Sequence, residues 1–331
     1  MSDHYQIFGA ELSPYSVKVR AYFRYKGIPH DWLPRTDENM AEFQKFAKLP
    51  LVPLVVSNHG DAWQDSTPII EEFETMFPEP AIVPADPALA FLSALIEEYA
   101  DEWANKYMFH YRWWYDADQV SAAQRLARDA RPHAADVEIE AMAQMLRERM
   151  VQRLGFVGSH STTKEQIESS FIRTLKLLEK HLTHRPFLFG GRPALADFGL
   201  AAQLYQCWTD PTPRKLFDQK APNVAAWAEQ MQDPSAEGEF ENWESLETTL
   251  LPFLQSEIGG LFLPWSDANA IALEQGKEKM SVTLEGKPFT QTAQKYHARS
   301  LGILRERYAG LSGNQLLDTV LAKAGCQQFL V

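Results

Sequence analysis

The chain has 331 residues, of which 45% are hydrophobic and 23% charged. This composition is ordinary for globular proteins, and the length allows two domains. The formal net charge of −12 argues against a nucleic-acid surface, because phosphate binding usually needs a basic patch. No segment approaches the roughly 18 consecutive apolar residues of a membrane span, and residues 1–4 show no basic region before an apolar core. Cys207 and Cys326 lie outside any paired metal spacing, so we expect reduced thiols, no metal and a cytoplasmic protein.

A short apolar run, Tyr5 to Phe8, predicts the first strand, and Gly9 can end it. Ser13-Pro14 then predicts the start of a helix. A serine at the N-cap accepts a hydrogen bond from an unpaired amide, and proline suits the first helical position because it has no N–H. Gly27, followed by Pro29, ends this helix. The helix start would present free N–H groups, the positive end of the dipole and the Ser13 hydroxyl to an anion.

Further strands and helices follow at short intervals. They are a strand at His30 to Leu33, a short helix to Phe46 capped by Thr36 or Asp37, a hairpin of Leu54 to Val56 and Ala62-Trp63, and a helix at Ile69 to Met76 after Asp65-Ser66. The helix between the first two strands is the crossover that a parallel pair requires. The predicted order is βαβαββα.

The quartet Ser13-Pro14-Tyr15-Ser16 resembles the active-site turn of thioredoxin-fold proteins, where Cys-Pro-Tyr-Cys opens the first helix. With both cysteines replaced by serine, the chain is similar to the serine-type glutathione transferases. The resemblance implies that Ser13 holds the thiolate of bound glutathione, while Tyr15 packs against its own helix or lines the pocket. A serine cannot form the mixed disulfide of a thiol–disulfide oxidoreductase, so that activity is excluded. For the motif alone, the alternative is that Ser13 is only a helix cap.

The resemblance implies two further glutathione contacts. Val52-Pro53 occupies the place of the family's cis-proline, whose preceding residue offers its backbone N–H and C=O to the cysteinyl unit. Asp65 would meet the α-ammonium of the γ-glutamyl unit, and Ser66 with the helix N-terminus would bind its α-carboxylate. Taken alone, this pair is an N-cap signal. The family's contact to the glycyl carboxylate is missing, because Leu51 stands where many relatives have Lys or Gln, and Lys48 or Arg35 would have to substitute.

Residues 80–88, which are rich in proline, predict a stiff linker between a thioredoxin-like domain at 1–79 and an all-helical domain at 89–236. Helical periodicity predicts helices at Leu89 to Arg112, Ser121 to Ala130, Val137 to Leu154 and Gln166 to His181. Ala194 to Asp197 resembles the capping box of the family's second signature. Only Asp197 of its reciprocal pair remains, because Ala194 has no hydroxyl.

Aromatic residues gather between Trp103 and Tyr115. One interpretation is a hydrophobic-substrate pocket facing Ser13, with Tyr107, His110 and Tyr111 as its polar tips. The other is packing between helices. The sequence does not identify a partner that would make His110 a catalytic base.

Residues 237–331 exceed what an ordinary glutathione transferase needs. They predict loop and helix-start segments at 258–262 and 265–267, a short strand with a turn from Met280 to Pro288, and helices at Thr292 to Arg307 and Gly313 to Lys323. We interpret this extension as a cover near the active-site mouth or as a surface for a partner.

The predicted fold class is therefore an α/β thioredoxin-like domain plus an all-α glutathione-transferase domain with an extra C-terminal segment. The predicted function is attack of a glutathione thiolate, stabilised by Ser13, on a small hydrophobic electrophile. Glutathione is the co-substrate, and the expected assembly is a homodimer with no nucleic-acid or membrane partner. The alternative is a non-catalytic glutathione-transferase-like binding or regulatory protein.

Overall fold

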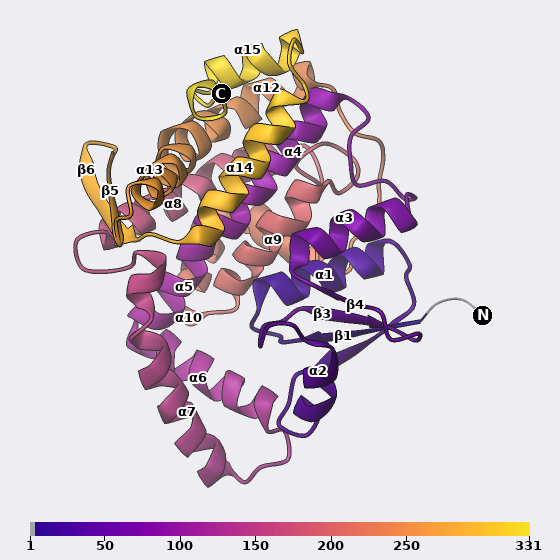
Figure 1. The fold of residues 1–331 in the computed structure, drawn as a ribbon, viewed down its shortest axis with the longest axis vertical. Helices are drawn as coiled ribbons and strands as arrows, with labels where there is room; N and C mark the ends of the chain where they lie inside the picture. The colour runs from indigo at the N-terminus through magenta and orange to yellow at the C-terminus, as the bar shows by residue number, and fades with distance from the viewer. Residues whose placement is uncertain (1–3) are drawn as a thin grey trace.

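The computed structural model describes residues 4–331 and shows a small mixed sheet with flanking helices beside a larger helical body (Figure 1). The sheet has the order β2-β1-β3-β4. Its strands are β1 (Tyr5–Gly9), β2 (His30–Pro34), β3 (Leu54–Ser57) and β4 (Ala62–Gln64), and the helices among them are α1 (Pro14–Tyr25), α2 (Met40–Phe46) and α3 (Ser66–Met76). β1 pairs parallel with β2, while β1 with β3 and β3 with β4 pair antiparallel. The predicted βαβαββα order is confirmed. Residues 1–3, which belong to the stretch expected to lack an export signal, lie outside the described residues.

Helix α1 begins and ends as the sequence predicts. Ser13 accepts a hydrogen bond from the Ser16 N–H at 3.3 Å, and Pro14 occupies the first helical position. Gly27 has a φ of 62°, a left-handed conformation that glycine adopts without steric cost. Most of α1 is buried, because it packs against β1, α3 and helix α9 (Leu195–Trp208).

The predicted cap of α2 is wrong. The helix begins at Met40, after Asn39, instead of being capped by Thr36 or Asp37. Thr36 and Asn39 hydrogen-bond each other reciprocally: the Thr36 N–H donates to Asn39 Oδ1 at 2.9 Å, and the Asn39 N–H donates to Thr36 Oγ1 at 3.3 Å. The threonine hydroxyl is thus used in the turn before the helix.

The helical body starts with one long rod that the sequence predicted as Leu89 to Arg112. It consists of α4 (Pro87–Tyr99), the π-helical segment η1 (Ala100–Ala104) and α5 (Asn105–Trp114), and is followed by α6 (Asp116–Ala130), α7 (Asp136–Val151), η2 (Leu154–Val157), α8 (Lys164–Leu182), α9, α10 (Pro211–Lys220) and α11 (Pro222–Gln230). Asp197 accepts hydrogen bonds from the N–H groups of Ala194 at 2.9 Å and Leu188 at 2.8 Å, and from Trp227 Nε1 at 3.0 Å. The remaining half of the capping box therefore joins three segments at the start of α9.

The C-terminal extension is mainly helical. It comprises α12 (Trp243–Phe253), the π-helical η3 (Leu254–Phe262), α13 (Leu263–Glu274), β5 (Lys279–Leu284), β6 (Lys287–Thr292), α14 (Lys295–Ala309), α15 (Gln315–Lys323) and η4 (Gln327–Phe329). The loop and helix-start segments predicted at 258–262 and 265–267 are wrong, because both lie within the continuous run from α12 to α13. A Cβ at Gly259 would lie 2.0 Å from the Ala324 carbonyl oxygen, so this glycine permits close packing and does not break the helix. The strand predicted at Met280 to Leu284 is β5, but the sequence did not predict the second strand of the hairpin, β6, which includes Pro288 of the expected turn and Thr292 of the expected helix.

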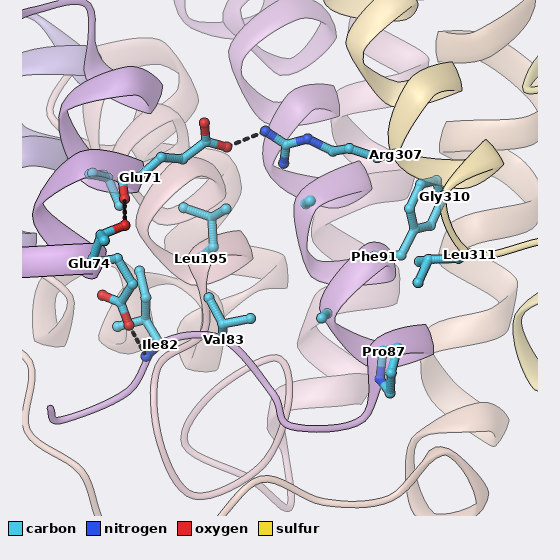
Figure 2. A pocket seen from close by; sticks show the side chains of 14 residues that line it. Glu71, Glu74, Ile82, Val83, Pro87, Phe91, Leu195, Arg307, Gly310 and Leu311 are labelled. Carbon is cyan, nitrogen blue, oxygen red and sulfur yellow. Dashed lines mark hydrogen bonds and ion pairs between the residues drawn. The ribbon is translucent and has the colours of Figure 1, made fainter. Parts of the chain in front are cut away.

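Helix α14 runs alongside α4 (Figure 1). Arg307, near its C-terminal end, forms an ion pair with Glu71 of α3 (Figure 2). The extension therefore contacts the thioredoxin-like domain as well as the helical domain.

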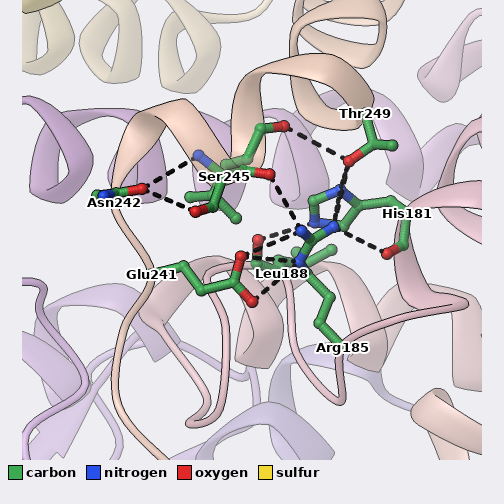
Figure 3. Close-up of polar contacts among 8 residues, drawn as sticks. His181, Arg185, Leu188, Glu241, Asn242, Ser245 and Thr249 are labelled. Atoms are coloured by element: carbon green, nitrogen blue, oxygen red, sulfur yellow. Dashed lines mark hydrogen bonds and ion pairs between the residues drawn. The ribbon is translucent and has the colours of Figure 1, made fainter.

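The start of the extension is fixed to the helical domain by a polar network centred on Arg185, which follows α8 (Figure 3). Arg185 pairs with Glu241 at 3.1 Å and donates to the Ser245 carbonyl oxygen at 3.1 Å. His181 bridges Thr249 of α12 at 2.8 Å and the Leu188 carbonyl oxygen at 2.9 Å. These contacts hold α12 against α8 and the segment before α9.

One continuous hydrophobic cluster includes residues of both domains and of the extension, among them Phe73, Trp103, Leu204 and Trp265. None of the helices in residues 4–331 is long and apolar enough to cross a membrane.

Candidate functional site

Ser13 stands half-buried at the N-terminus of α1. Its Oγ accepts the cap hydrogen bond from the Ser16 N–H. A hydroxyl has two acceptor sites and one donor, so the cap bond leaves the O–H free to donate. The cap and the thiolate-binding role are therefore compatible at the level of hydrogen bonding.

The peptide bond between Val52 and Pro53 is cis, as the resemblance implies. It lies directly before β3, with Val52 half-buried and Pro53 buried. The Val52 backbone thus lies just before the N-terminal end of the inner strand β3, and the resemblance assigns this backbone to the cysteinyl unit.

The start of α3 differs from an ordinary capped helix. Asp65 has a φ of 84° and makes no side-chain cap bond. This left-handed conformation costs a non-glycine residue of order 1–3 kcal/mol, and such strain concentrates at functional sites. Asp65 is exposed, whereas Ser66 is buried.

A buried lysine, Lys18 of α1, lies beneath this helix start. Its ammonium donates to Thr67 Oγ1 at 3.0 Å and to Asp101 Oδ2 at 2.7 Å, lies 3.4 Å from Ser66 Oγ and is in contact with Glu97. Burial alone would lower the pKa of Lys18, but Asp101 and Glu97 hold it above its ordinary value. A permanent positive charge therefore lies next to the serine proposed for a carboxylate. Lys18 is a site residue that the sequence does not predict, because a lysine between Val17 and Val19 gives no sign that it is buried in a polar cluster.

Tyr15 connects α1 to the π-helical segment η1. Its hydroxyl donates to the Asp101 carbonyl oxygen at 3.0 Å. Burial and the nearby Asp101 raise the pKa of Tyr15 well above its usual value, so the phenol stays protonated. Tyr15 also lines a cavity of about 220 Å³, together with Asp101 and Glu102 of η1 and Tyr296 and His297 of α14.

Arg35 and Lys48, the two candidates for the glycyl carboxylate, line one cavity of about 440 Å³ together with Arg149 of α7. Arg35 also donates to the Pro50 carbonyl oxygen at 2.9 Å. Leu51 is 59% exposed. The structure thus gathers three cations close to the chain segment that leads into the cis-proline.

Tyr107, His110 and Tyr111 occupy core positions, at 0%, 0% and 3% exposure. The Tyr107 hydroxyl is within hydrogen-bonding distance of Tyr99, Ser170 and Thr174. His110 has the partners that the sequence could not identify, since its Nδ1 is 2.7 Å from Ser159 Oγ and its Nε2 is 3.1 Å from Glu168. None of these three side chains lines the 220 Å³ cavity beside Tyr15, and their contacts are those of helix packing.

A larger cleft of about 550 Å³ lies between α3, α4 and α14 (Figure 2). Its walls are mainly apolar, with Ile70, Phe91 and Leu311 among the lining residues. The ion pair of Arg307 with Glu71 spans it, and Glu74 accepts from the Ile82 N–H at 3.2 Å. In the part of the chain described here, no group of three or more His, Cys, Asp or Glu side chains is placed to hold a metal ion.

Two family models match this chain. Residues 7–81 match the glutathione S-transferase N-terminal domain, and residues 114–230 match the glutathione S-transferase C-terminal domain. Together the matches cover more than half of the chain, and they agree with the thioredoxin-like sheet and the helical body described above. The chain belongs to the glutathione S-transferase family.

Among curated proteins, the chain is similar to the uncharacterized GST-like protein YibF of Escherichia coli (strain K12), with 31% identity over 100 residues. That match spans 29% of this chain and 48% of YibF. The chain thus matches about half of the length of this relative.

Among solved structures, the beta-etherase LigF from Sphingobium sp. strain SYK-6 is 21% identical with a TM-score of 0.49, over 71% of this chain and 96% of LigF. A glutathione S-transferase from Methylobacillus flagellatus, solved with glutathione bound, is 19% identical with a TM-score of 0.41, over 70% of this chain and 95% of that one. Similarities of this size concern the fold alone.

Proposed function

We propose that the protein is a serine-type glutathione transferase in which the Ser13 hydroxyl stabilises the glutathione thiolate. The observation that carries this proposal is the place of Ser13, at the N-terminus of α1 with its O–H free to donate. Glutathione would lie along the Val52-Pro53 edge, with its γ-glutamyl unit at Asp65 and Ser66 and its thiol at Ser13. The glycyl carboxylate would face the cavity of Arg35 and Lys48.

The energies involved are sufficient. A free thiol has a pKa near about 8.5, and lowering it by about two units requires about 2.7 kcal/mol of preferential thiolate stabilisation. A hydrogen bond to a charged group contributes about 1.5–3 kcal/mol, and the helix dipole adds about 0.3–1 kcal/mol. One serine hydroxyl at a helix start can therefore supply the shift, after which the thiolate attacks an electrophile.

The test is Ser13→Ala, measured as conjugation of a generic electrophile across pH. We expect lower activity at neutral pH and a higher apparent pKa of bound glutathione, with glutathione affinity in calorimetry largely kept. Ser16→Ala is the matched control. It removes a buried hydroxyl of the same helix that has no hydrogen-bond partner among the described residues. Equal activity and an unchanged pH profile in Ser13→Ala would contradict the proposal.

The second candidate is a non-catalytic glutathione-binding protein, and the cap bond from the Ser16 N–H to Ser13 favours it, because it gives Ser13 a structural role. This candidate predicts glutathione binding with no conjugation above the uncatalysed rate. Ser13→Cys separates the two. A cysteine poised at this helix start should have a low pKa and gain thiol-transferase activity, whereas an inert cysteine would favour the non-catalytic protein.

We also propose the homodimer that the resemblance implies, formed through α3 and α4. Helix α14 already lies along α4, and Arg307 reaches Glu71 of α3. A dimer through this face would have to include α14 or displace it. Sedimentation at micromolar concentration giving a mass near 37.7 kDa would contradict the dimer.

A further inference from the structure

The cavity beside Tyr15 is formed partly by the C-terminal extension and is lined mainly by polar and charged residues. It lies where α1, η1, α5 and the C-terminal extension meet. Its lining is mostly polar or charged, and Gln291, Gln294, Tyr296 and His297 come from the extension. A pocket that selects a hydrophobic molecule is instead lined mainly by apolar side chains with few polar groups. The residues of this lining therefore supply charged and hydrogen-bonding groups that a purely hydrophobic electrophile would leave unused.

Asp101 lines this cavity and has one carboxylate oxygen without a hydrogen-bond partner among residues 4–331. Its side chain is 8% exposed, and Oδ2 accepts from Lys18 at 2.7 Å and Thr67 at 3.3 Å. Oδ1 is buried and has no hydrogen-bond partner among residues 4–331. Leaving a buried acceptor unpaired is unfavourable, and more so for a charged group. An N–H donor of a ligand would remove this cost.

The charges around Asp101 are unbalanced. Lys18 is shared between two buried carboxylates, Glu97 and Asp101, so one negative charge has no partner of its own. Burial and the neighbouring Glu97 also raise the pKa of Glu98 to about 8, as expected where negative charge is in excess. A buried charge is stable only when it is paired. Burial and the neighbouring Glu97 also raise the pKa of Asp101 to about 6, against the lowering effect of Lys18. The cluster thus holds more carboxylates than cations.

The other basic side chains that line the cavity, Lys106 and His297, have partners of their own, and burial lowers the pKa of both. Lys106 donates to the Val157 carbonyl oxygen at 3.1 Å and to Gln291 Oε1 at 2.8 Å, and lies 4.0 Å from the centroid of the Trp265 ring. His297 is in contact with Glu102. Neither contact places a positive group on Asp101 Oδ1.

We propose that this cavity is the second-substrate site and that it selects an electrophile carrying an ammonium group, which donates to Asp101 Oδ1. This inference rests on the proposed transferase function and names its substrate class. The π-helical turn supports it, because such turns occur frequently at functional sites, and here η1 carries both Asp101 and Glu102. Tyr296, 50% exposed, stands on the cavity wall that the extension contributes.

The reaction that tests this is addition to an acrylamide. The glutathione thiolate forms a C–S bond at the β-carbon, the C=C π bond breaks, and its electron pair takes a proton at the α-carbon. The proton lost by the thiol balances the proton gained by carbon, so no oxidant, reductant or further reactant is needed.

Three acrylamides of similar size serve as probes at pH 7.5: N-(2-aminoethyl)acrylamide, the neutral N-propylacrylamide and the anionic N-acryloyl-β-alanine. We expect kcat/KM for the ammonium probe to exceed that for the neutral probe by about 10- to 100-fold, because a hydrogen bond between charged partners contributes about 1.5–3 kcal/mol. The anionic probe should be the poorest. Equal values for the ammonium and neutral probes would overturn the proposal.

Asp101→Asn should reduce the preference for the ammonium probe to within about threefold, with Asp218→Asn, an exposed carboxylate of α10, as the matched control. The alternative partner for Asp101 is the α-ammonium of glutathione itself. If Asp101→Asn weakens glutathione in calorimetry but keeps the ammonium preference, Asp101 belongs to the γ-glutamyl site and the proposal is wrong.

A second variant covers the case in which Asp101→Asn does not fold. Gln294→Lys adds a cation to the lining and should lower the ammonium preference at least threefold, whereas Gln275→Lys, on an exposed helix end, should not. An unchanged preference in Gln294→Lys would contradict the proposed site.

Binding of unreactive analogues separates this proposal from the proposed function. N-(2-aminoethyl)propanamide and N-propylpropanamide lack the double bond and are titrated into the glutathione complex. Tighter binding of the ammonium analogue without any conjugation would support the site while the transferase function fails. Conjugation of all three acrylamides, with equal binding of the two analogues, would support the transferase function and overturn the proposed ammonium site.

Discussion

The two helix starts that the resemblance assigns to glutathione carry similar sequences and have different structures. At α1, Ser13-Pro14 forms a capped helix, and the serine accepts its bond from the backbone three residues on. At α3, Asp65 has a positive φ and no cap bond, and Ser66 lies against the buried ammonium of Lys18. The same local signal thus produced a cap in one place and a strained turn over a buried charge cluster in the other. The buried charge beside the start of α3 is Lys18, a residue of α1.

The largest expected effect comes from removing that lysine. Lys18→Met leaves Glu97 and Asp101 without their shared counter-ion, and we expect a loss of about 3–5 kcal/mol of the free energy of unfolding. Urea denaturation measures it. Lys45→Met, which removes an exposed pair with Glu42, should cost no more than about 0.5 kcal/mol. A similar, small cost for both variants would mean that Lys18 does not stabilise the α3 start.

Glu168 of α8, a half-buried carboxylate away from both helix starts, provides a second comparison. Burial alone would raise the pKa of Glu168, but hydrogen bonds from His110, Lys164 and Tyr115 lower it to about 2. Its folded pKa lies below its unfolded value, so its stabilising contribution is present above pH 4.5 and is lost as pH falls toward 2. Glu168→Gln should lower the free energy of unfolding at pH 7 by about 1–3 kcal/mol and flatten its dependence on pH between 5 and 2.

Thermal unfolding at a series of pH values measures this effect. Glutathione affinity should stay unchanged in Glu168→Gln, in contrast to Lys18→Met, because Glu168 contacts neither helix start. A Glu168→Gln variant that keeps the full acid dependence of the parent would show that another carboxylate causes it.

The strained backbone at the start of α3 should lower the free energy of unfolding and contribute to glutathione binding. Asp65→Gly relieves the φ of 84° and should raise the free energy of unfolding by about 1 kcal/mol, while glutathione affinity falls by about 1–3 kcal/mol. Ser66→Ala should weaken glutathione by a similar amount. Calorimetry and denaturation of the same samples measure both quantities. Glutathione binding within a factor of about two of the parent in both variants would place the γ-glutamyl unit elsewhere.

The smallest effect is expected at the glycyl end of the proposed ligand. Arg35→Ala and Lys48→Ala should each weaken glutathione by about 0.2–1 kcal/mol, since partly exposed ion pairs contribute little. γ-Glutamylcysteine, which lacks the glycyl carboxylate, is the matched probe and should bind the variants as it binds the parent. Equal losses of affinity for both ligands would mean that Arg35 and Lys48 affect binding through the structure of the protein and not by contact with the glycyl carboxylate.

The sequence by itself determined the features that depend on near neighbours in the chain. The cap at Ser13, the left-handed Gly27, the βαβαββα order and the β3–β4 hairpin follow from local chemistry, because serine, proline and glycine have strong backbone preferences. The resemblance, and not the residues alone, predicted the cis bond at Val52-Pro53. Asp197 likewise kept its half of the capping box.

Only the tertiary structure decided the features that depend on segments far apart in the chain. The burial of Lys18 is set by α3 and η1, the close packing at Gly259 by the approach of Ala324, and the core placement of Tyr107 and His110 by α8. The polar cavity beside Tyr15 exists because α14 lies against η1. None of these has a local signal, since burial and charge pairing depend on which distant groups supply the partner.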